Sequence, residues 1–140
     1  MRDRIAATVA AALAVALLAA CASRPPTQIS GTASVTVDGK DRTLHIVKCG
    51  QLQWTRTIDI GGNFAGAKVV IDEDVQPATV ESVRIQNLGG FSGMYSRGDG
   101  GNADMSVTGD KFTISGTANG YKTDKPSEPA TAAFKIVVTC

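Results

Sequence analysis

Polar and apolar residues alternate over most of the chain from residue 34 to the C-terminus. In the segment 34–37, Val35 and Val37 are separated by polar residues, and Val83 and Ile85 alternate with polar neighbours in the same way. A repeat of two residues is typical of a β-strand with one buried face. Similar alternation predicts about eight mostly antiparallel strands, in segments 34–37, 42–49, 52–60, 67–71, 79–88, 103–108, 112–114 and 131–140. No apolar stripe with helical spacing runs for more than two turns, so we expect an all-β fold.

Two short turns predict β-hairpins. Asp38-Gly39 follows the first predicted strand, and Gly109-Asp110 separates the strand 103–108 from the strand that contains Phe112 and Ile114. A two-residue loop that contains glycine is typical of a hairpin, because glycine readily adopts positive φ. We therefore expect each of these two strand pairs to be antiparallel neighbours.

The segment 131–140 predicts the strand with the most apolar face. Phe134, Ile136, Val138 and Cys140 share that face, because side chains alternate along a strand. We expect the face to be buried, with Cys140 pointing into the core. Residues 34–140 suffice for one domain with a single core. The predicted architecture is a small two-layer sandwich or a rolled sheet.

The N-terminus has a different pattern. Arg2 and Arg4 precede an uncharged run that ends in Leu18-Ala19-Ala20-Cys21. A basic start, a short apolar stretch and small residues before a cysteine are typical of a bacterial lipoprotein signal, whose cysteine receives a diacylglyceryl group. An uncleaved transmembrane anchor is the alternative, but the 16 residues from Ile5 to Ala20 fall short of the roughly 20 apolar residues that a spanning helix needs. We expect residues 1–20 to be removed and Cys21 to be lipidated.

The chain has three cysteines. If Cys21 carries lipid, Cys49 and Cys140 remain, and an even number of cysteines in an exported chain favours a disulfide. The bridge would tie the first hairpin to the last strand, whereas two free buried thiols are the alternative. Two distant cysteines and the single His45 cannot supply the closely spaced ligands of a zinc site. We therefore expect no metal centre and no cofactor.

Residues 21–33 are predicted to form a flexible tether, because they combine Pro25-Pro26 with small polar residues. The chain carries 14 Lys and Arg and 13 Asp and Glu, and loss of Arg2, Asp3 and Arg4 with the signal leaves 12 of each. A neutral protein lacks the charge that would draw it to nucleic acid or to anionic lipid. We expect attachment to the outer face of the membrane through acyl chains on Cys21.

Five segments occur together in a characteristic order: Val37-Asp38-Gly39-Lys40-Asp41, Cys49, Ile58-Asp59-Ile60-Gly61-Gly62, Lys111-Phe112-Thr113-Ile114-Ser115-Gly116-Thr117-Ala118 and Phe134-Lys135-Ile136-Val137-Val138-Thr139-Cys140. From about Val35 to the C-terminus the chain resembles the mycobacterial nineteen-kilodalton lipoprotein antigen family. The resemblance implies an acylated surface lipoprotein without known catalysis, sensed by a host pattern-recognition receptor, Toll-like receptor 2, through its lipid. In this sequence that role falls on Cys21. The tether is shorter than the glycosylated, threonine-rich tether of the best-known members, which leaves glycosylation open.

Residues of catalytic type occur singly. Ser92 lies in Gly90-Phe91-Ser92-Gly93, which falls short of a nucleophile elbow, and no helix is predicted to follow it. His45 lies within a predicted strand, where we expect a structural role. We likewise expect Trp54 and Tyr121 to pack in the protein rather than to form a sugar-binding platform.

Two charged motifs also favour simple interpretations. Asp72-Glu73-Asp74 lacks the oxygen spacing and the glycine of a calcium loop, so we expect a solvated turn. Arg97-Gly98-Asp99 matches an integrin-type tripeptide in a glycine-rich loop, where a chance match is the simpler interpretation.

Three classes of function remain. We favour a non-enzymatic envelope lipoprotein that acts as a surface antigen, an interaction module or an envelope constituent. The second class is a carrier that encloses a lipid or another apolar ligand, although four Phe, two Tyr and one Trp barely fill the core of the domain itself. The third is an envelope hydrolase, for which the sequence shows no assembled base, nucleophile and orienting group.

Overall fold

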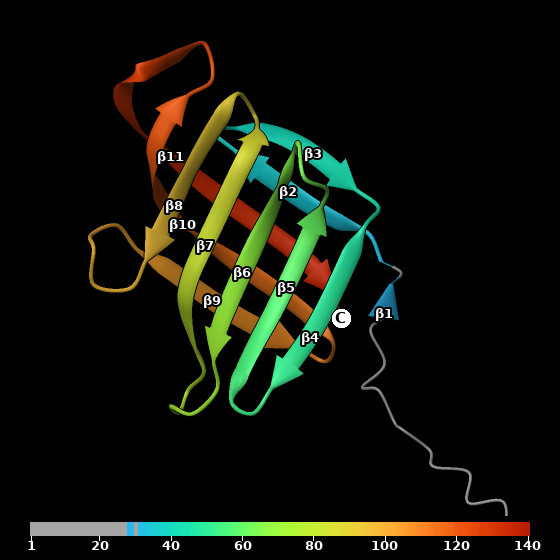
Figure 1. Ribbon diagram of the computed structural model, residues 1–140. Coiled ribbons are helices and arrows are strands. Elements are labelled where there is room, and N and C mark those ends of the chain that lie inside the picture. Colours follow the sequence, from blue (N-terminus) through green and yellow to red (C-terminus); the bar gives the residue numbers. More distant parts are fainter. Residues whose placement is uncertain (1–27, 30) are drawn as a thin grey trace, which may run out of the picture.

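The computed structural model describes residues 28, 29 and 31–140. Within this part of the chain every regular element is a β-strand, which confirms the predicted all-β fold (Figure 1). The strands are β1 (Gln28–Ile29), β2 (Ala33–Val37), β3 (Lys40–Leu44), β4 (Val47–Leu52), β5 (Thr55–Gly61), β6 (Gly66–Asp72), β7 (Thr79–Leu88), β8 (Phe91–Ser96), β9 (Ala103–Thr108), β10 (Lys111–Lys122) and β11 (Lys125–Thr139).

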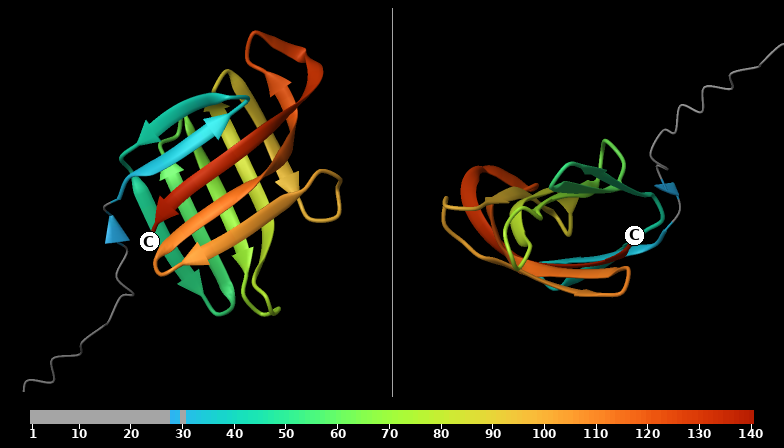
Figure 2. Two further views of the ribbon diagram at one scale, coloured as in Figure 1. Left: turned by 180° about the vertical axis from the view of Figure 1, so that it is seen from behind. Right: turned by 90° about the horizontal axis from the view of Figure 1, so that it is seen from below.

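The strands form one antiparallel sheet that rolls back over itself. Their order is β1-β4-β5-β6-β7-β8-β10-β11-β2-β3, and β9 pairs with β10 beside this path. Strands β4 to β8 make one layer, and β9, β10, β11, β2 and β3 cross behind them as the second layer (Figure 1; Figure 2 shows the two layers from below). Of the two predicted architectures, the structure is therefore the rolled sheet.

The sheet passes from one layer to the other along β10. Residues 111–116 of β10 pair with β9, whereas residues 119–122 pair with β8. Gly93 of β8 lies opposite Gly120 of β10. A Cβ on Gly120 would collide with the carbonyl oxygen of Ser92, and one on Gly93 would lie 2.6 Å from the Asn119 oxygen. The two glycines therefore allow the backbones to approach closely where the sheet turns.

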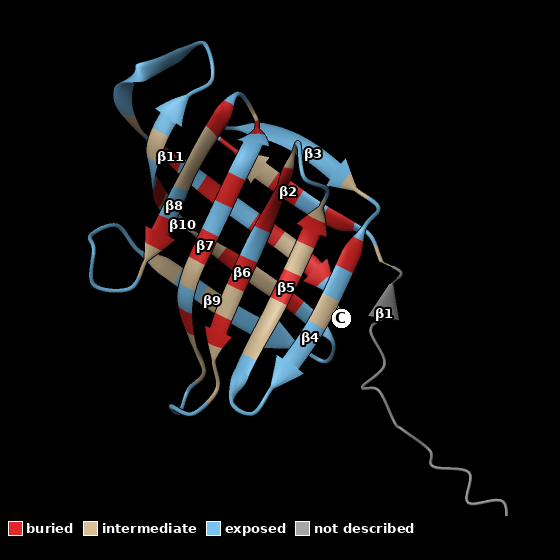
Figure 3. Cartoon of the chain, viewed as in Figure 1, coloured by how far each residue is buried: buried red, intermediate tan, exposed pale blue. Residues whose placement is uncertain are grey.

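Both layers contribute their inward side chains to one core. The predicted alternation places Val35 and Val37 of β2, and Ile136 and Val138 of β11, opposite the buried isoleucines and valines of β5, β6 and β7 (Figure 3). Complete burial of each such side chain contributes about 1.5–3 kcal/mol. The core is thus mostly aliphatic, and its largest fully buried side chain is Phe91.

Both predicted hairpins are present. In the first, Val37 pairs with Lys40, and the two turn residues Asp38 and Gly39 have φ of 52° and 75°. In the second, Thr108 pairs with Lys111 across Gly109-Asp110, and Gly109 has φ of 61°. Positive φ suits the right-handed twist of the flanking strands, which explains the glycine in each turn.

The structure has eleven strands where the sequence predicted about eight. The predicted strand 42–49 is divided into β3 and β4 at His45-Ile46, because the chain leaves one layer there and enters the other. Strand β8 contains Gly93 and lacks strict alternation, and β1 has two residues, so neither gives a periodic signal.

The predicted disulfide between Cys49 and Cys140 is present. It joins β4 to the end of β11, with 5.9 Å between the Cα atoms. The backbone N–H of Cys140 also donates a hydrogen bond to the Asp110 carbonyl at 2.9 Å. As predicted, Phe134, Ile136 and Val138 are buried on one face of β11, and Cys140 packs partly buried against this core. The bridge therefore fastens the two layers where the roll comes back on itself.

Removal of the bridge should destabilise the domain strongly. Cys49 and Cys140 are 91 residues apart, and the chain-entropy model gives about 4 to 5 kcal/mol for a loop of this length. We expect the Cys49→Ser/Cys140→Ser double variant to lose a few kcal/mol of unfolding free energy in urea titrations. The wild-type protein in reducing agent is the matched control and should lose a similar amount. Unchanged midpoints in both samples would contradict this role.

The close approach of Gly93 and Gly120, where the sheet passes between layers, can be tested by the same urea titrations. Gly120→Ala should destabilise the domain by about 1–3 kcal/mol, because the added methyl group meets backbone atoms of β8. Gly50→Ala on β4 is the control, since a Cβ there has nothing within 4 Å, and it should change stability by about 0.5 kcal/mol or less. Equal effects of the two substitutions would show that the sheet does not require the backbones of β8 and β10 to approach closely at Gly120.

Candidate functional site

The predicted lipidation site lies outside the described residues, as do Leu18, Ala19 and Ala20. The first described residues, Gln28 and Ile29, pair with Cys49 and Lys48 of β4. The chain therefore enters the sheet beside the disulfide. Gln28, Ile29 and Ala33 lie in strands, and Ala33 is fully buried, although the sequence had placed all three in the tether. A flexible tether stays a prediction for residues 21–27.

One end of the roll is closed by a half-buried ion pair. Arg56 Nε lies 2.6 Å from Glu73 Oε1, and Arg56 Nη2 donates to Gln51 Oε1 at 2.8 Å. Gln51 Nε2 donates in turn to Glu73 Oε2 at 2.7 Å. The Arg56 guanidinium lies 5.4 Å from the centroid of the Phe112 ring. Arg56, Glu73, Phe112 and Cys140 line a hollow of about 260 Å³, so the ion pair supports the end of the roll nearest the disulfide.

A second hollow, of about 340 Å³, lies on the outer face of β4 to β7. Its charged lining residues are Lys48, Asp59, Lys68 and Arg84. The strand register places them in one row, with Lys48 opposite Asp59, Asp59 opposite Lys68, and Lys68 opposite Arg84. We call this set the cation row. It could not be found from the sequence, because its members are brought together only by the register of four strands.

His45 does not have the predicted position. It lies in the two-residue break between β3 and β4 and is exposed, so the expectation of a structural histidine within a strand is wrong. Ser92 lies in β8, where its Oγ accepts a hydrogen bond from the Asn87 N–H at 2.8 Å. Three strands separate β4 from β8 in the sheet. The structure therefore gives no support to a His45–Ser92 catalytic pair.

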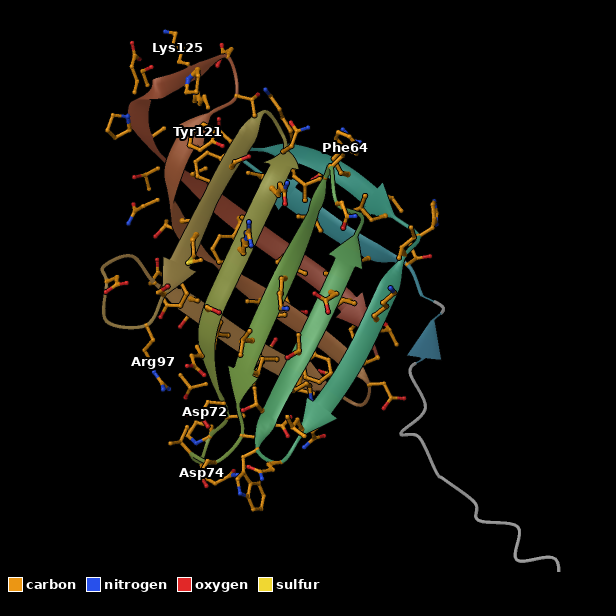
Figure 4. The ribbon with its side chains drawn as sticks, in the orientation of Figure 1. Phe64, Asp72, Asp74, Arg97, Tyr121 and Lys125 are labelled. Atoms are coloured by element: carbon orange, nitrogen blue, oxygen red, sulfur yellow. A yellow bond between two sulfur atoms is a disulfide. The ribbon has the colours of Figure 1, made fainter. Side chains whose placement is uncertain are left out.

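The acidic turn is partly paired. Asp72 Oδ2 lies 3.3 Å from Arg97 Nη2, and Glu73 pairs with Arg56 as described above. Figure 4 shows Arg97 extending towards Asp72, with Asp74 nearby at the end of the domain opposite Phe64. Among the described residues no group of three or more His, Cys, Asp or Glu side chains is placed to hold a metal ion. Arg97-Gly98-Asp99 lies in the exposed loop between β8 and β9, where the Arg97 side chain donates a hydrogen bond to Asp72.

The two aromatic residues that we expected to pack are instead exposed. Trp54 is 63% exposed in the turn between β4 and β5, and Tyr121 is 41% exposed near the end of β10. Phe64, in the loop between β5 and β6, is 89% exposed. The prediction fails because each residue lies in or beside a turn that projects beyond the core. Exposure of a turn residue cannot be derived from its hydrophobicity.

These features define a small, disulfide-stabilised all-β domain of the kind found in exported proteins. The chain belongs to the Mycobacterium 19 kDa lipoprotein antigen family, whose sequence profile matches residues 26–140. Membership of a lipoprotein family makes it an exported, membrane-associated lipoprotein. Residues 28, 29 and 31–140 include no helix that could cross a membrane.

Individual relatives agree with this assignment. A protein of Mycobacterium indicus pranii, named as a lipoprotein, is 74% identical over 140 residues, which cover all of both chains. A second protein named as a lipoprotein, from Mycobacterium avium subsp. hominissuis, is 63% identical over 140 residues, all of this chain and 97% of the relative. Lipoprotein LpqH of Mycobacterium tuberculosis H37Rv is 36% identical over 108 residues, which cover 76% of this chain and 67% of LpqH.

The ion pair at the end of the roll gives a further prediction. Arg56→Lys keeps the charge but loses the forked hydrogen bonds to Glu73 and Gln51 and the contact with Phe112, so we expect a loss of about 1 kcal/mol in unfolding free energy. Arg97→Lys is the control, because Arg97 is more exposed and its pair should contribute about 0.5 kcal/mol or less. A larger loss for Arg97→Lys would contradict the assignment of the supporting role to Arg56.

Proposed function

We propose that this protein is a non-enzymatic cell-envelope lipoprotein, held on the outer face of the membrane by acyl chains on Cys21. The observation that carries the proposal is Leu18-Ala19-Ala20-Cys21 near the start of a chain that belongs to a lipoprotein family. Two acyl chains form a stable anchor, because each buried methylene group contributes about 0.8 kcal/mol. The mature chain is formally neutral, so the proposed attachment rests on lipid rather than on charge.

The position of β1 keeps the domain near the proposed anchor. Seven peptide steps separate Cys21 from Gln28, the first residue of β1. An extended chain advances at most about 3.5 Å per residue, which limits the separation of these two Cα atoms to roughly 25 Å. The domain would therefore be displayed close to the membrane surface, with the disulfide beside β1, where the chain from Cys21 enters the sheet.

Display on the outer face accounts for an antigenic role. The family is named for lipoprotein antigens. A host pattern-recognition receptor would bind the acylated N-terminus, so in this proposal recognition depends on Cys21. The β domain then determines which other envelope molecules the lipoprotein contacts.

The interior of the domain favours this role over that of a lipid carrier. Side chains from both layers, among them Val35, Ile58, Val69 and Ile136, are fully buried in one continuous core. A carrier would need a hollow between the layers that is large enough for acyl chains. The two hollows described above, at the end of the roll and on the outer face, include charged or polar lining residues.

Intact-mass measurement of the protein extracted from its own membrane tests the proposal. The wild-type mass should equal that of residues 21–140 plus acyl chains, because the signal is removed and Cys21 is modified. Cys21→Ala should lose the acyl mass and leave the membrane fraction. Ser23→Ala is the matched control and should retain both. A wild-type protein that carries residues 1–20 or lacks acyl mass would overturn the proposal.

A further inference from the structure

The cation row is an unusual arrangement for the outer face of a sheet. Neighbouring strands lie about 4.8 Å apart, so side chains opposite one another in register are direct neighbours. Lys68 of β6 and Arg84 of β7 are such a pair, and both are positively charged. Like charges directly opposite each other destabilise a sheet. The row therefore carries a local cost that the fold itself does not require.

The charges within the row do not balance. Lys48, Lys68 and Arg84 supply three positive charges, and Asp59 supplies one negative charge. Asp59 Oδ1 lies 3.8 Å from Lys68 Nζ, a long contact between two half-exposed side chains. Farther along β6 on the same face, Asp72 is held by Arg97. Two positive charges in the row therefore have no counter-charge in the hollow.

The surface beside the row is hollowed. Gly61 of β5 pairs with Gly66 of β6, and Gly66 pairs with Gln86 of β7. Gly61, Gly66 and Gln86 lie next to the cation row and form part of the wall of the same hollow of about 340 Å³. The Gln86 amide is held by the Asn63 carbonyl, to which its Nε2 donates at 2.9 Å. Backbone oxygens of Ile60 and Ala65 occupy the positions where Gly66 and Gly61 would carry a Cβ, so the room for an anion is the hollow of about 340 Å³ beside the cationic side chains.

We propose that this hollow binds a phosphate group, supplied either by a free phosphate or phosphomonoester or by a lipid headgroup. A phosphomonoester carries a charge of about −1.5 to −2 at pH 7, which matches the excess of two positive charges in the row, whereas a phosphodiester headgroup carries a single negative charge and neutralises half of that excess. Arg84 provides the planar pair of N–H donors that suits phosphate oxygens, and Lys48 and Lys68 provide point charges on either side of Asp59. Binding would offset the repulsion between Lys68 and Arg84.

Calorimetric titration of the complete mature protein in neutral detergent tests this site. Inorganic phosphate is the probe for the free source, and glycerophosphoinositol is the probe for a headgroup source. We expect saturable one-to-one binding of at least one probe, weakened by added salt. Stronger binding of inorganic phosphate would assign the site to the free source, and stronger binding of glycerophosphoinositol would assign it to the headgroup. If neither probe binds, the proposal is wrong.

Substitutions within the row separate this site from general surface charge. Arg84→Gln should weaken binding about 10-fold, because it removes the forked donor. It should not lower the thermal midpoint, since it also removes a like-charge contact. Asp59→Asn should strengthen binding several-fold, because it removes the carboxylate that competes for Lys68.

Lys135→Gln on β11 is the matched control. Lys135 is exposed on the other layer, and its loss changes the net charge as Arg84→Gln does. Its binding should equal that of the wild type. Equal weakening by Lys135→Gln and Arg84→Gln, or weaker binding by Asp59→Asn, would overturn the site. The result does not depend on acylation of Cys21, so this test and the test of the anchor can fail independently.

Discussion

The Cys49–Cys140 bridge is the constraint on which the rest of the structure depends, because it joins the parts of the sheet that come together when it rolls. β4 and β11 belong to different layers and are far apart in the strand order. Their core side chains can be buried only while the two layers stay together. The same bridge lies beside β1, where the chain enters from its N-terminal segment. One covalent link therefore supports both the core and the place where the chain enters the sheet.

Local features of the sequence were sufficient to predict the hairpins and the buried face of β11, whereas the disulfide was predicted from the even number of remaining cysteines in a chain with an export signal. Asp38-Gly39 and Gly109-Asp110 specify their turns through backbone conformation, and alternation specifies which side of β11 is buried. Features that depend on distant contacts could not be predicted. The break at His45, the exposure of Trp54 and the cation row all follow from where the sheet turns and which strands become neighbours.

The side chains that stabilise the domain and those of the proposed phosphate site lie on opposite faces of the sheet. Apolar residues of both layers meet inside, and the charged groups of the cation row face outward on β4 to β7. A lipoprotein built in this way would hold lipid through its N-terminal cysteine and would leave its outer face free to contact other envelope molecules. Because the chain would be formally neutral after the proposed removal of residues 1–20, such contacts would rest on local groups of charge rather than on net charge.

The central claim is that lipid is attached to the protein covalently and that the interior of the rolled sheet is filled by the protein's own side chains. Native mass spectrometry of the membrane-extracted protein, compared with its mass after denaturation, tests both parts directly. The account predicts the same acylated mass under both conditions. An additional apolar mass that is present in the native state and lost on denaturation would contradict it.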